Sequence, residues 1–372
     1  MPARIINKSL AVKAMERAAI GTLIAMLFMF STSVTSKEND SVGDVAIARL
    51  FATESPLTVT IEAPLTTLMN ERPEEEYLEG TFRFTEVDGT ARTLDLKLRT
   101  RGNYRREEKH CNFTPIRLNF RESQVVGTEF DGQDKLKMVT NCRSRNWRYE
   151  QLLLREYLAY RILNVMTTKS FAVRLLHVNY VDTEGGKPMT KLGFLIEDDD
   201  DVAERNGMIV IRSGHISNDK LDRKHQNLVH VFQYLIGNTE YSLFRAEPGK
   251  DCCHNVDLIS ATSDGPFTPL AYDFDFAGIV NAHYAQPNPR YKLDDVRQRL
   301  FKGRCENVDL LPDTFQRFQD RKEAIYGLVE ELEGLNLRYR REITRYLNSF
   351  YDHIAKPRSV KNRFLKRCVD SP

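Results

Sequence analysis

Three oxygen-bearing side chains in the second half of the chain are of the types that phosphoryl transfer requires. Glu240, Asn255 and Asp273 follow one another within residues 237–278, at expected strand ends and turns. Transfer of a phosphoryl group needs one acid to orient or deprotonate the acceptor, and an amide and a carboxylate to hold Mg²⁺ against the phosphates. The order of the three residues predicts Glu240 as the base and Asn255 and Asp273 as metal ligands.

Asp275 adds a further carboxylate to this segment. In the run Asp273-Phe-Asp275, strand spacing would place both acids on one face, where they suit a second metal or a structural role. A plainer interpretation is also open, because the same two acids suit a solvated strand end beside Gly278. In the same way, His254 and Asn255 could satisfy backbone groups of a turn.

The elements that must position these residues begin with a strand-rich first half. Apolar and polar residues alternate in several short segments, and the turn at Asp88-Gly89 predicts a hairpin. The expected strands cover residues 57–62, 80–85, 92–101, 116–120, 135–140, 172–181 and 192–196.

One helix interrupts these strands, over residues 147–163, where apolar residues repeat at helical spacing. Glu156 falls on its apolar face. A carboxylate buried there needs a cation or a strong donor, because an unpaired buried charge is costly. The alternative is a glutamate at the rim, paired locally with Arg155 or Arg161.

The second half is predicted to be mainly helical, with helices over 225–235, 313–335 and 337–354. Four consecutive aspartates, 198–201, could bind a hard cation, but a solvated helix start favoured by the helix dipole is the preferred interpretation. The resulting organisation is a β-rich part over 37–198, a helical part over 199–355 that contains the segment 237–278, and a basic tail over 356–372.

The composition excludes several classes of protein. The chain has 372 residues, of which 41% are hydrophobic, so it can bury a sizeable core and is neither fibrous nor largely disordered. Its 54 basic and 52 acidic residues leave a formal charge of only +2. A nucleic-acid partner is therefore not expected.

The first 36 residues have the layout of a secretory signal peptide. A basic start leads into the uncharged stretch 18–30 and then into small polar residues. This layout predicts export to the periplasm or cell envelope, with no stable membrane span after the leader is cleaved. The alternative is an uncleaved amphipathic anchor.

Six cysteines in an exported chain favour disulfides. We expect a bridge between Cys111 and Cys142, and a second one from Cys252 or Cys253 to Cys305. Free buried thiols in a reducing compartment are the alternative.

Several short segments resemble the spore-coat CotH-like kinase family, whose fold is an atypical protein-kinase-like fold. The resemblance extends over residues 80–280. Its matching pieces are Arg101-Gly-Asn103 after a strand, residues 112–120, the strand 135–141 with the following helix, and the series Asn238, Asn255 and Asp273.

The resemblance implies an α+β, two-lobed protein-kinase-like fold, with a β-rich lobe carrying one helix and a mainly helical second lobe. It also implies ATP and Mg²⁺ as cofactors. Glu156 becomes the helix carboxylate that pairs with a nucleotide-facing cation. That cation would be Lys137 or Arg117, with Lys135 a weaker choice, and Arg101 belongs to the nucleotide-binding set.

The function predicted on this basis is an Mg²⁺-dependent phosphotransferase that acts on a protein or another hydroxyl-bearing acceptor at the cell envelope. Some features depart from the family pattern. The base position holds Glu240 in place of aspartate, the spacing to Asn255 is long, and no Gly-x-Gly-x-x-Gly loop is present. The alternative is a non-catalytic pseudokinase, or an envelope binding module stabilised by disulfides.

Overall fold

A computed structural model describes residues 47–246 and 249–370, and the predicted leader, residues 1–36, lies outside them. Within the described residues, no helix is long and apolar enough to cross a bilayer. The strands are β1 (Leu57–Ala63), β2 (Leu78–Thr85), β3 (Ala91–Thr100), β4 (Ile116–Phe120), β5 (Lys135–Thr140), β6 (Val173–Asp182), β7 (Met189–Ile196), β8 (Ile209–Ile211), β9 (Val256–Ser260) and β10 (Thr268–Ala271). The α-helices are α1 (Arg49–Ala52), α2 (Leu65–Glu71), α3 (Glu122–Val125), α4 (Trp147–Met166), α5 (Asp199–Arg205), α6 (Arg223–Ile236), α7 (Leu311–Asp320), α8 (Lys322–Glu331), α9 (Leu337–Ala355) and α10 (Pro357–Val360).

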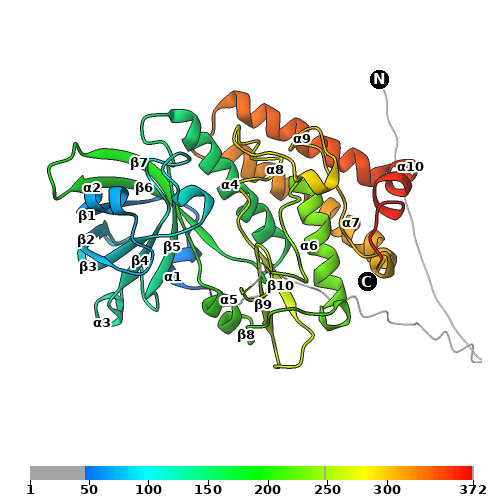
Figure 1. Ribbon diagram of the computed structural model, residues 1–372, viewed down its shortest axis with the longest axis horizontal. Helices are drawn as coiled ribbons and strands as arrows, with labels where there is room; N and C mark the ends of the chain where they lie inside the picture. The colour runs from blue at the N-terminus through cyan, green and yellow to red at the C-terminus, as the bar shows by residue number, and fades with distance from the viewer. Residues whose placement is uncertain (1–46, 247–248, 371–372) are drawn as a thin grey trace, which may run out of the picture. The chain divides into compact units, whose positions relative to one another are not determined.

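Seven strands form a closed barrel in the order β1-β2-β3-β4-β5-β7-β6 (Figure 1). Neighbouring strands pair antiparallel except at the closure, where β1 runs parallel to β6 from Leu57 opposite Leu176 to Ala63 opposite Asp182. The predicted strands of the first half are confirmed, with ends that differ by three residues or fewer.

The predicted two-lobed, protein-kinase-like fold is wrong. The first half is a closed barrel with additional helices, and the second half contains a three-stranded sheet, so helix and strand are mixed along the chain. The physical reason is that alternation within a strand shows which side chains face inward but not which sheet edges join. The parallel β1–β6 pairing joins segments more than 110 residues apart, and no local pattern encodes it.

Strands β6 and β7 have two buried faces. Leu176, Val178 and Leu195 point into the barrel core, whereas Leu175 and Phe194 belong to the core that surrounds α4. Strands buried on both faces tend to be continuously apolar, as the run Phe194-Leu195-Ile196 at the end of β7 is.

Helix α4 is buried on nearly all sides, and fourteen of its residues have almost no exposed surface. Asn146 caps its start, with its side chain accepting a hydrogen bond from the backbone N–H of Arg148. The helix packs on β6 and β7 on one side and on α8 on another (Figure 1). Glu156, at the middle of the helix, is therefore carried into the interior.

The remaining helices and a small sheet complete the structure. Strands β8, β9 and β10 pair antiparallel, and α6 ends at Gly237, whose φ of 69° lies in the left-handed region. The helices predicted over 225–235 and 337–354 are confirmed as α6 and α9. The helix predicted over 313–335 is instead two helices, α7 and α8, that meet at Arg321.

All six cysteines form disulfides, in the pairs Cys111–Cys142, Cys252–Cys253 and Cys305–Cys368. The predicted bridge between Cys111 and Cys142 is confirmed. The predicted bridge from Cys252 or Cys253 to Cys305 is wrong, because Cys305 pairs with a cysteine in the C-terminal tail that the sequence analysis left unassigned.

Candidate functional site

A single guanidinium joins three carboxylates near the start of the β3–β4 connection. Arg105, in the short 3₁₀ turn Tyr104–Arg106, places Nη1 2.9 Å from Oε2 of Glu156 and Nη2 3.1 Å from its Oε1. Its Nη2 also lies 3.4 Å from Oδ1 of Asp273, and its Nε lies 3.3 Å from Oδ2 of Asp275. The fork of the guanidinium thus connects α4 with the loop that follows β10.

Burial and charge act in opposite directions on this group. Glu156 is only 2% exposed, and burial raises the pKa of its carboxyl while Arg105 lowers it. Burial alone would lower the pKa of Arg105, but the carboxylates of Glu156, Asp275 and Asp273 raise it well above the ordinary value. The guanidinium therefore stays charged in a buried place.

The prediction that Glu156 needs a cation is confirmed, and the alternative of a local rim pair is wrong. Arg161 instead pairs with Glu54, and Arg155 donates to the backbone carbonyl of Gln151. The partner of Glu156, Arg105, was not among the residues selected from the sequence. A buried acid in the sequence indicates that a cation must pair with it, but it does not indicate which loop carries that cation.

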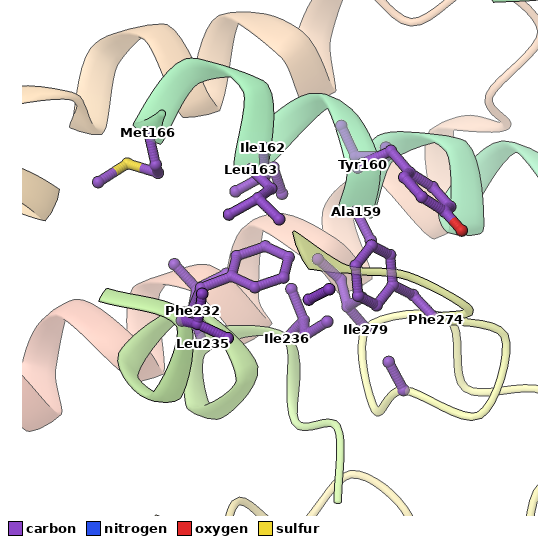
Figure 2. Close-up of a cluster of buried hydrophobic side chains, with 14 of the residues drawn as sticks. Ala159, Tyr160, Ile162, Leu163, Met166, Phe232, Leu235, Ile236, Phe274 and Ile279 are labelled. Carbon is purple, nitrogen blue, oxygen red and sulfur yellow. The ribbon is translucent and has the colours of Figure 1, made fainter. Parts of the chain in front are cut away.

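The Asp273-Phe-Asp275 segment is held by its central side chain. Phe274 is fully buried, with its ring centroid 4.6 Å from that of Tyr160 and 5.4 Å from that of Phe232. Figure 2 shows this ring between α4 and α6, in a cluster of apolar side chains. The hydroxyl of Tyr160 also accepts a hydrogen bond of 2.9 Å from the backbone N–H of Asp273. The anchored phenylalanine thus fixes the two flanking carboxylates.

The two aspartates have different surroundings. The side chain of Asp273 is 43% exposed, whereas that of Asp275 is 8% exposed. Burial raises the pKa of Asp275 well above its usual range, against the effect of Arg105, and the hydroxyl of Tyr284 donates to its Oδ2 over 3.3 Å. Asp273 is therefore the carboxylate available to a ligand, and Asp275 belongs to the interior.

Glu240 and Asn255 lie in the same loop cluster as Asp273. The side-chain amide of Asn255 donates to the backbone carbonyl of Glu240 over 2.8 Å, and the N–H of Glu240 donates to Oδ1 of Asn238 over 2.9 Å. Burial raises the pKa of the Glu240 carboxyl, and the charge of Asp273 raises it further. The structure thus brings together the three residues that the sequence selected for chemistry.

The backbone around this cluster is unusual. Among the described residues, five that are not glycine have positive φ, and two of them are Asn255 (56°) and Asp273 (58°). This conformation costs an L-residue about 1–2 kcal/mol, and Asn and Asp tolerate it best. Uncommon backbone geometry of this kind concentrates at functional sites.

Lys302 supports the segment that carries Glu240. Its ammonium donates to the carbonyl of Thr239 over 3.0 Å and to that of Tyr241 over 2.6 Å. Burial lowers the pKa of Lys302 to about 7, Arg290 lowers it as well, and Glu240 raises it. Lys302 was not predicted from the sequence, because a single lysine in a loop carries no pattern.

The predicted nucleotide-facing cations Lys137 and Arg117 are engaged with the aspartate run. Lys137 Nζ lies 3.9 Å from Oδ1 of Asp199, and Arg117 Nη2 lies 3.3 Å from Oδ2 of Asp198. Lys135, the weaker choice, pairs at the surface with Asp134 over 3.1 Å.

The preferred interpretation of residues 198–201 as a solvated helix start is wrong for most of the run. Asp199 is 5% exposed and also binds Arg212 over 2.5 Å, and of the four aspartates only Asp200 is exposed. The carboxyl of Asp257 lies close by, where burial raises its pKa to about 6 against the effect of Lys137. The run forms a half-buried ion-pair network because Arg117 of β4, Lys137 of β5 and Arg212 after β8 bring positive charges to it.

Tyr272 lies between this network and the Arg105 group. Burial raises the pKa of its hydroxyl, and the charges of Asp257 and Asp273 raise it further. Arg101, which acts on the same hydroxyl, has its own pKa lowered by burial, while Asp273 raises it. The predicted site residues thus fall into two adjoining charged groups rather than one.

The acids alone do not make a metal centre. In the part of the chain that the structure describes, no group of three or more His, Cys, Asp or Glu side chains could hold a metal ion. A cation held by Asn255 and Asp273 would therefore need further oxygen ligands from a bound substrate.

No protein-family model matches this chain, and no curated protein sequence matches it.

Proposed function

We propose that the protein is an Mg²⁺-dependent phosphotransferase that moves the γ-phosphoryl group of ATP to a hydroxyl-bearing acceptor, such as a protein, at the cell envelope. The observation that carries the proposal is the meeting of Glu240, Asn255 and Asp273 in one loop cluster, with Arg105 and Glu156 behind it. These are the residue types that phosphoryl transfer needs, and the motifs that resemble the CotH-like family contribute several of them. The proposal depends on this site and not on a kinase-like fold.

Asn255 and Asp273 fit a magnesium ion by their donor chemistry. Both offer hard oxygen atoms, which Mg²⁺ prefers, and Asp273 is accessible to a ligand. The amide nitrogen of Asn255 donates to the carbonyl of Glu240, so the amide oxygen Oδ1 of Asn255 points away from that carbonyl. When bound, Mg²⁺ would neutralise charge on the phosphates.

Glu240 suits the role of base. Its side chain is half-buried, and its raised pKa makes the carboxylate a better proton acceptor than an ordinary glutamate near neutral pH. The acceptor oxygen forms a bond to the γ-phosphorus as the bond from that phosphorus to the oxygen of ADP breaks. The hydroxyl proton passes to Glu240.

Lys137, Arg117 and Arg101 are the cations that we assign to the nucleotide. The first two lie in the network beside Tyr272, next to the loop that carries Asp273. Phosphate oxygens would compete there with the aspartates 198 and 199 for the same cations. Nucleotide binding would then redistribute charge in this network.

Melting temperatures test the binding step. Ligand that binds only the folded state stabilises it by about 2.7 kcal/mol at one hundred times its dissociation constant. We expect a shift in the wild type only when ATP and Mg²⁺ are both present, and none in Asp273→Ala. Asp200→Ala is the matched control, because it removes an exposed aspartate, and it should shift as the wild type does. Equal shifts in all three proteins would contradict the assignment of Asp273.

A second candidate is a pseudokinase, which binds nucleotide without turnover. It is favoured by the departures from the family pattern, since the base position holds Glu240 in place of aspartate and no Gly-x-Gly-x-x-Gly loop is present. Production of ADP separates the two candidates. A phosphotransferase should lose at least about a hundredfold in rate on Glu240→Gln while keeping its thermal shift with ATP and Mg²⁺. A wild type that binds ATP and Mg²⁺ but forms no ADP with any acceptor would favour the pseudokinase.

We also propose export, on the basis of the leader predicted over residues 1–36. The three disulfides support it, because such bonds persist in oxidising compartments.

A further inference from the structure

A small cavity with a basic lining adjoins the candidate site on the side of Arg105. Its volume is about 240 Å³. Its lining consists of basic, tyrosine and cysteine side chains: Tyr104, Arg105, Lys109, His110, Cys142, Arg143, Tyr149, His283 and Tyr284. None of these lining residues is acidic, so the cavity presents positive charge.

The cations of the cavity differ in how far they are already neutralised. Arg105 is balanced by three carboxylates, and Lys109 pairs with Glu107 over 2.6 Å at the surface. The guanidinium of Arg143 donates to the neutral backbone carbonyl of Lys109. Within the described residues, Arg143 forms no ion pair with a carboxylate, so its charge is available to a ligand.

Aromatic rings surround these charges. Tyr284, whose hydroxyl donates to Asp275, and Tyr149, whose hydroxyl lies 3.0 Å from Nε2 of His283, both belong to the lining. The ring of Tyr104 stacks on that of His110, with the centroids 3.6 Å apart. A small cavity with aromatic walls and with guanidinium and ammonium groups is suited to bind an anionic oxygen group, such as a carboxylate or a phosphate, on a small molecule or a side chain.

The disulfide between Cys111 and Cys142 fixes the two walls to each other. Lys109 and His110 directly precede Cys111, and Arg143 directly follows Cys142. The bridge therefore joins the loop cations to the opposing guanidinium across 31 residues of sequence. Preorganised cations lose little freedom when an anion binds.

We propose that this cavity binds an oxyanion of the acceptor, a carboxylate or a phosphate, so that the acceptor is an acidic molecule. The cavity begins at Arg105, which also contacts Asp273. An acceptor anchored there lies beside the candidate metal ligand, with its hydroxyl available to Glu240. This inference rests on the proposed function, since it names the substrate class of the same site.

The test uses inorganic phosphate and succinate as separate probes of the whole protein, at constant ionic strength. The variant Lys109→Gln/Arg143→Gln removes two cations of the cavity, and Lys97→Gln is the matched control, because Lys97 is exposed on strand β3. We expect at least one probe to raise the melting temperature of the wild type and of Lys97→Gln at tenfold or more lower concentration than that of the double variant. The probe that acts distinguishes a phosphate from a carboxylate acceptor.

With these probes, the inference is overturned by a double variant that responds as the wild type does, or by a wild type that responds to neither probe. A second measurement separates the acceptor from the nucleotide. The double variant should keep its full shift with ATP and Mg²⁺, whereas loss of that shift would assign the cavity to the phosphates of ATP and refute an acceptor site. If the wild type responds to ATP and Mg²⁺ but not to the probes, the cavity proposal fails and the proposed function stands. If the wild type responds to the probes but not to ATP and Mg²⁺, the proposed nucleotide site is refuted. The oxyanion can then no longer be assigned to an acceptor.

Discussion

The replacement Arg105→Met tests whether one guanidinium holds the candidate site together. Methionine keeps much of the side-chain volume and removes the charge. Glu156 and Asp275, with side chains 3% and 8% exposed, would then be buried without their cation. Breaking a buried ion pair by removing one partner costs about 3–5 kcal/mol. At roughly 2 °C per kcal/mol for a chain of this size, the melting temperature should fall by about 6–10 °C near pH 7.5.

The loss should depend on pH in a defined direction. Burial raises the pKa of Glu156 and of Asp275, and Arg105 opposes this effect in both cases. Without Arg105 both pKa values rise further, so the folded state holds these protons more firmly than the unfolded state does. A carboxyl whose pKa is raised in the folded state stabilises that state at low pH. This stabilisation is lost as the pH rises through the pKa of the folded state. The deficit of Arg105→Met should therefore be smallest near pH 4 and should grow toward pH 8.

Chemical or thermal unfolding at several pH values provides the assay. Arg83→Met is the matched control, because it removes an arginine whose 2.8 Å pair with Glu62 is 45% and 36% exposed, and such surface pairs contribute at most about 1 kcal/mol. Adding Glu156→Gln to Arg105→Met should restore part of the loss, since one buried charge is then removed. A deficit no larger than that of Arg83→Met, or one that does not change between pH 4 and pH 8, would refute the reasoning.

Three further predictions concern other charged groups and the Cys111–Cys142 disulfide. Burial lowers the pKa of Lys302 to about 7, so its contribution to the free energy of unfolding should grow as the pH rises from 7 toward 10. In Lys302→Met, this increase of the free energy of unfolding with pH should be absent from unfolding curves measured over the same range. Burial raises the pKa of Asp257 to about 6, so the stability of the wild type should decline as the pH rises from 4 to 6. Asp257→Asn should therefore melt at a higher temperature than the wild type at pH 7.5. An unchanged melting curve would contradict the raised pKa of Asp257. Replacing Cys111 and Cys142 together by serine should lower the free energy of unfolding by about 2–4 kcal/mol in denaturant titrations, because the bridge closes a loop of some thirty residues. A loss below about 1 kcal/mol would indicate that other contacts hold this loop without the disulfide.

The local elements of the structure could be predicted from the sequence because their signals are local. Alternation identified several of the barrel strands, and apolar spacing identified α4, α6 and α9. The closure of the barrel could not be predicted, since the pairing of β1 with β6 depends on segments far apart in the chain. The break at Arg321 between α7 and α8 has no proline or glycine to mark it.

The candidate site was partly predictable for a related reason. Glu240, Asn255 and Asp273 were recognisable because their types and order suit one reaction, and Glu156 was recognisable as an acid on an apolar helix face. Arg105 was missed because the loop that carries it contains several arginines, and only the fold decides which one is turned inward. The aspartates at 198–201 were misjudged because their partners come from β4, β5 and the residue after β8.

The dependence of ATP binding on Mg²⁺ tests the central claim most directly. Isothermal titration calorimetry would give the affinity for ATP, with and without Mg²⁺, in the wild type and in Asp273→Asn and Asn255→Ala. We predict that Mg²⁺ raises the affinity of the wild type at least tenfold and leaves both variants nearly unchanged, because Asn255 and Asp273 hold the metal only together with the phosphates. A wild type that binds ATP equally well with and without Mg²⁺, or variants that respond to Mg²⁺ as the wild type does, would contradict the claim.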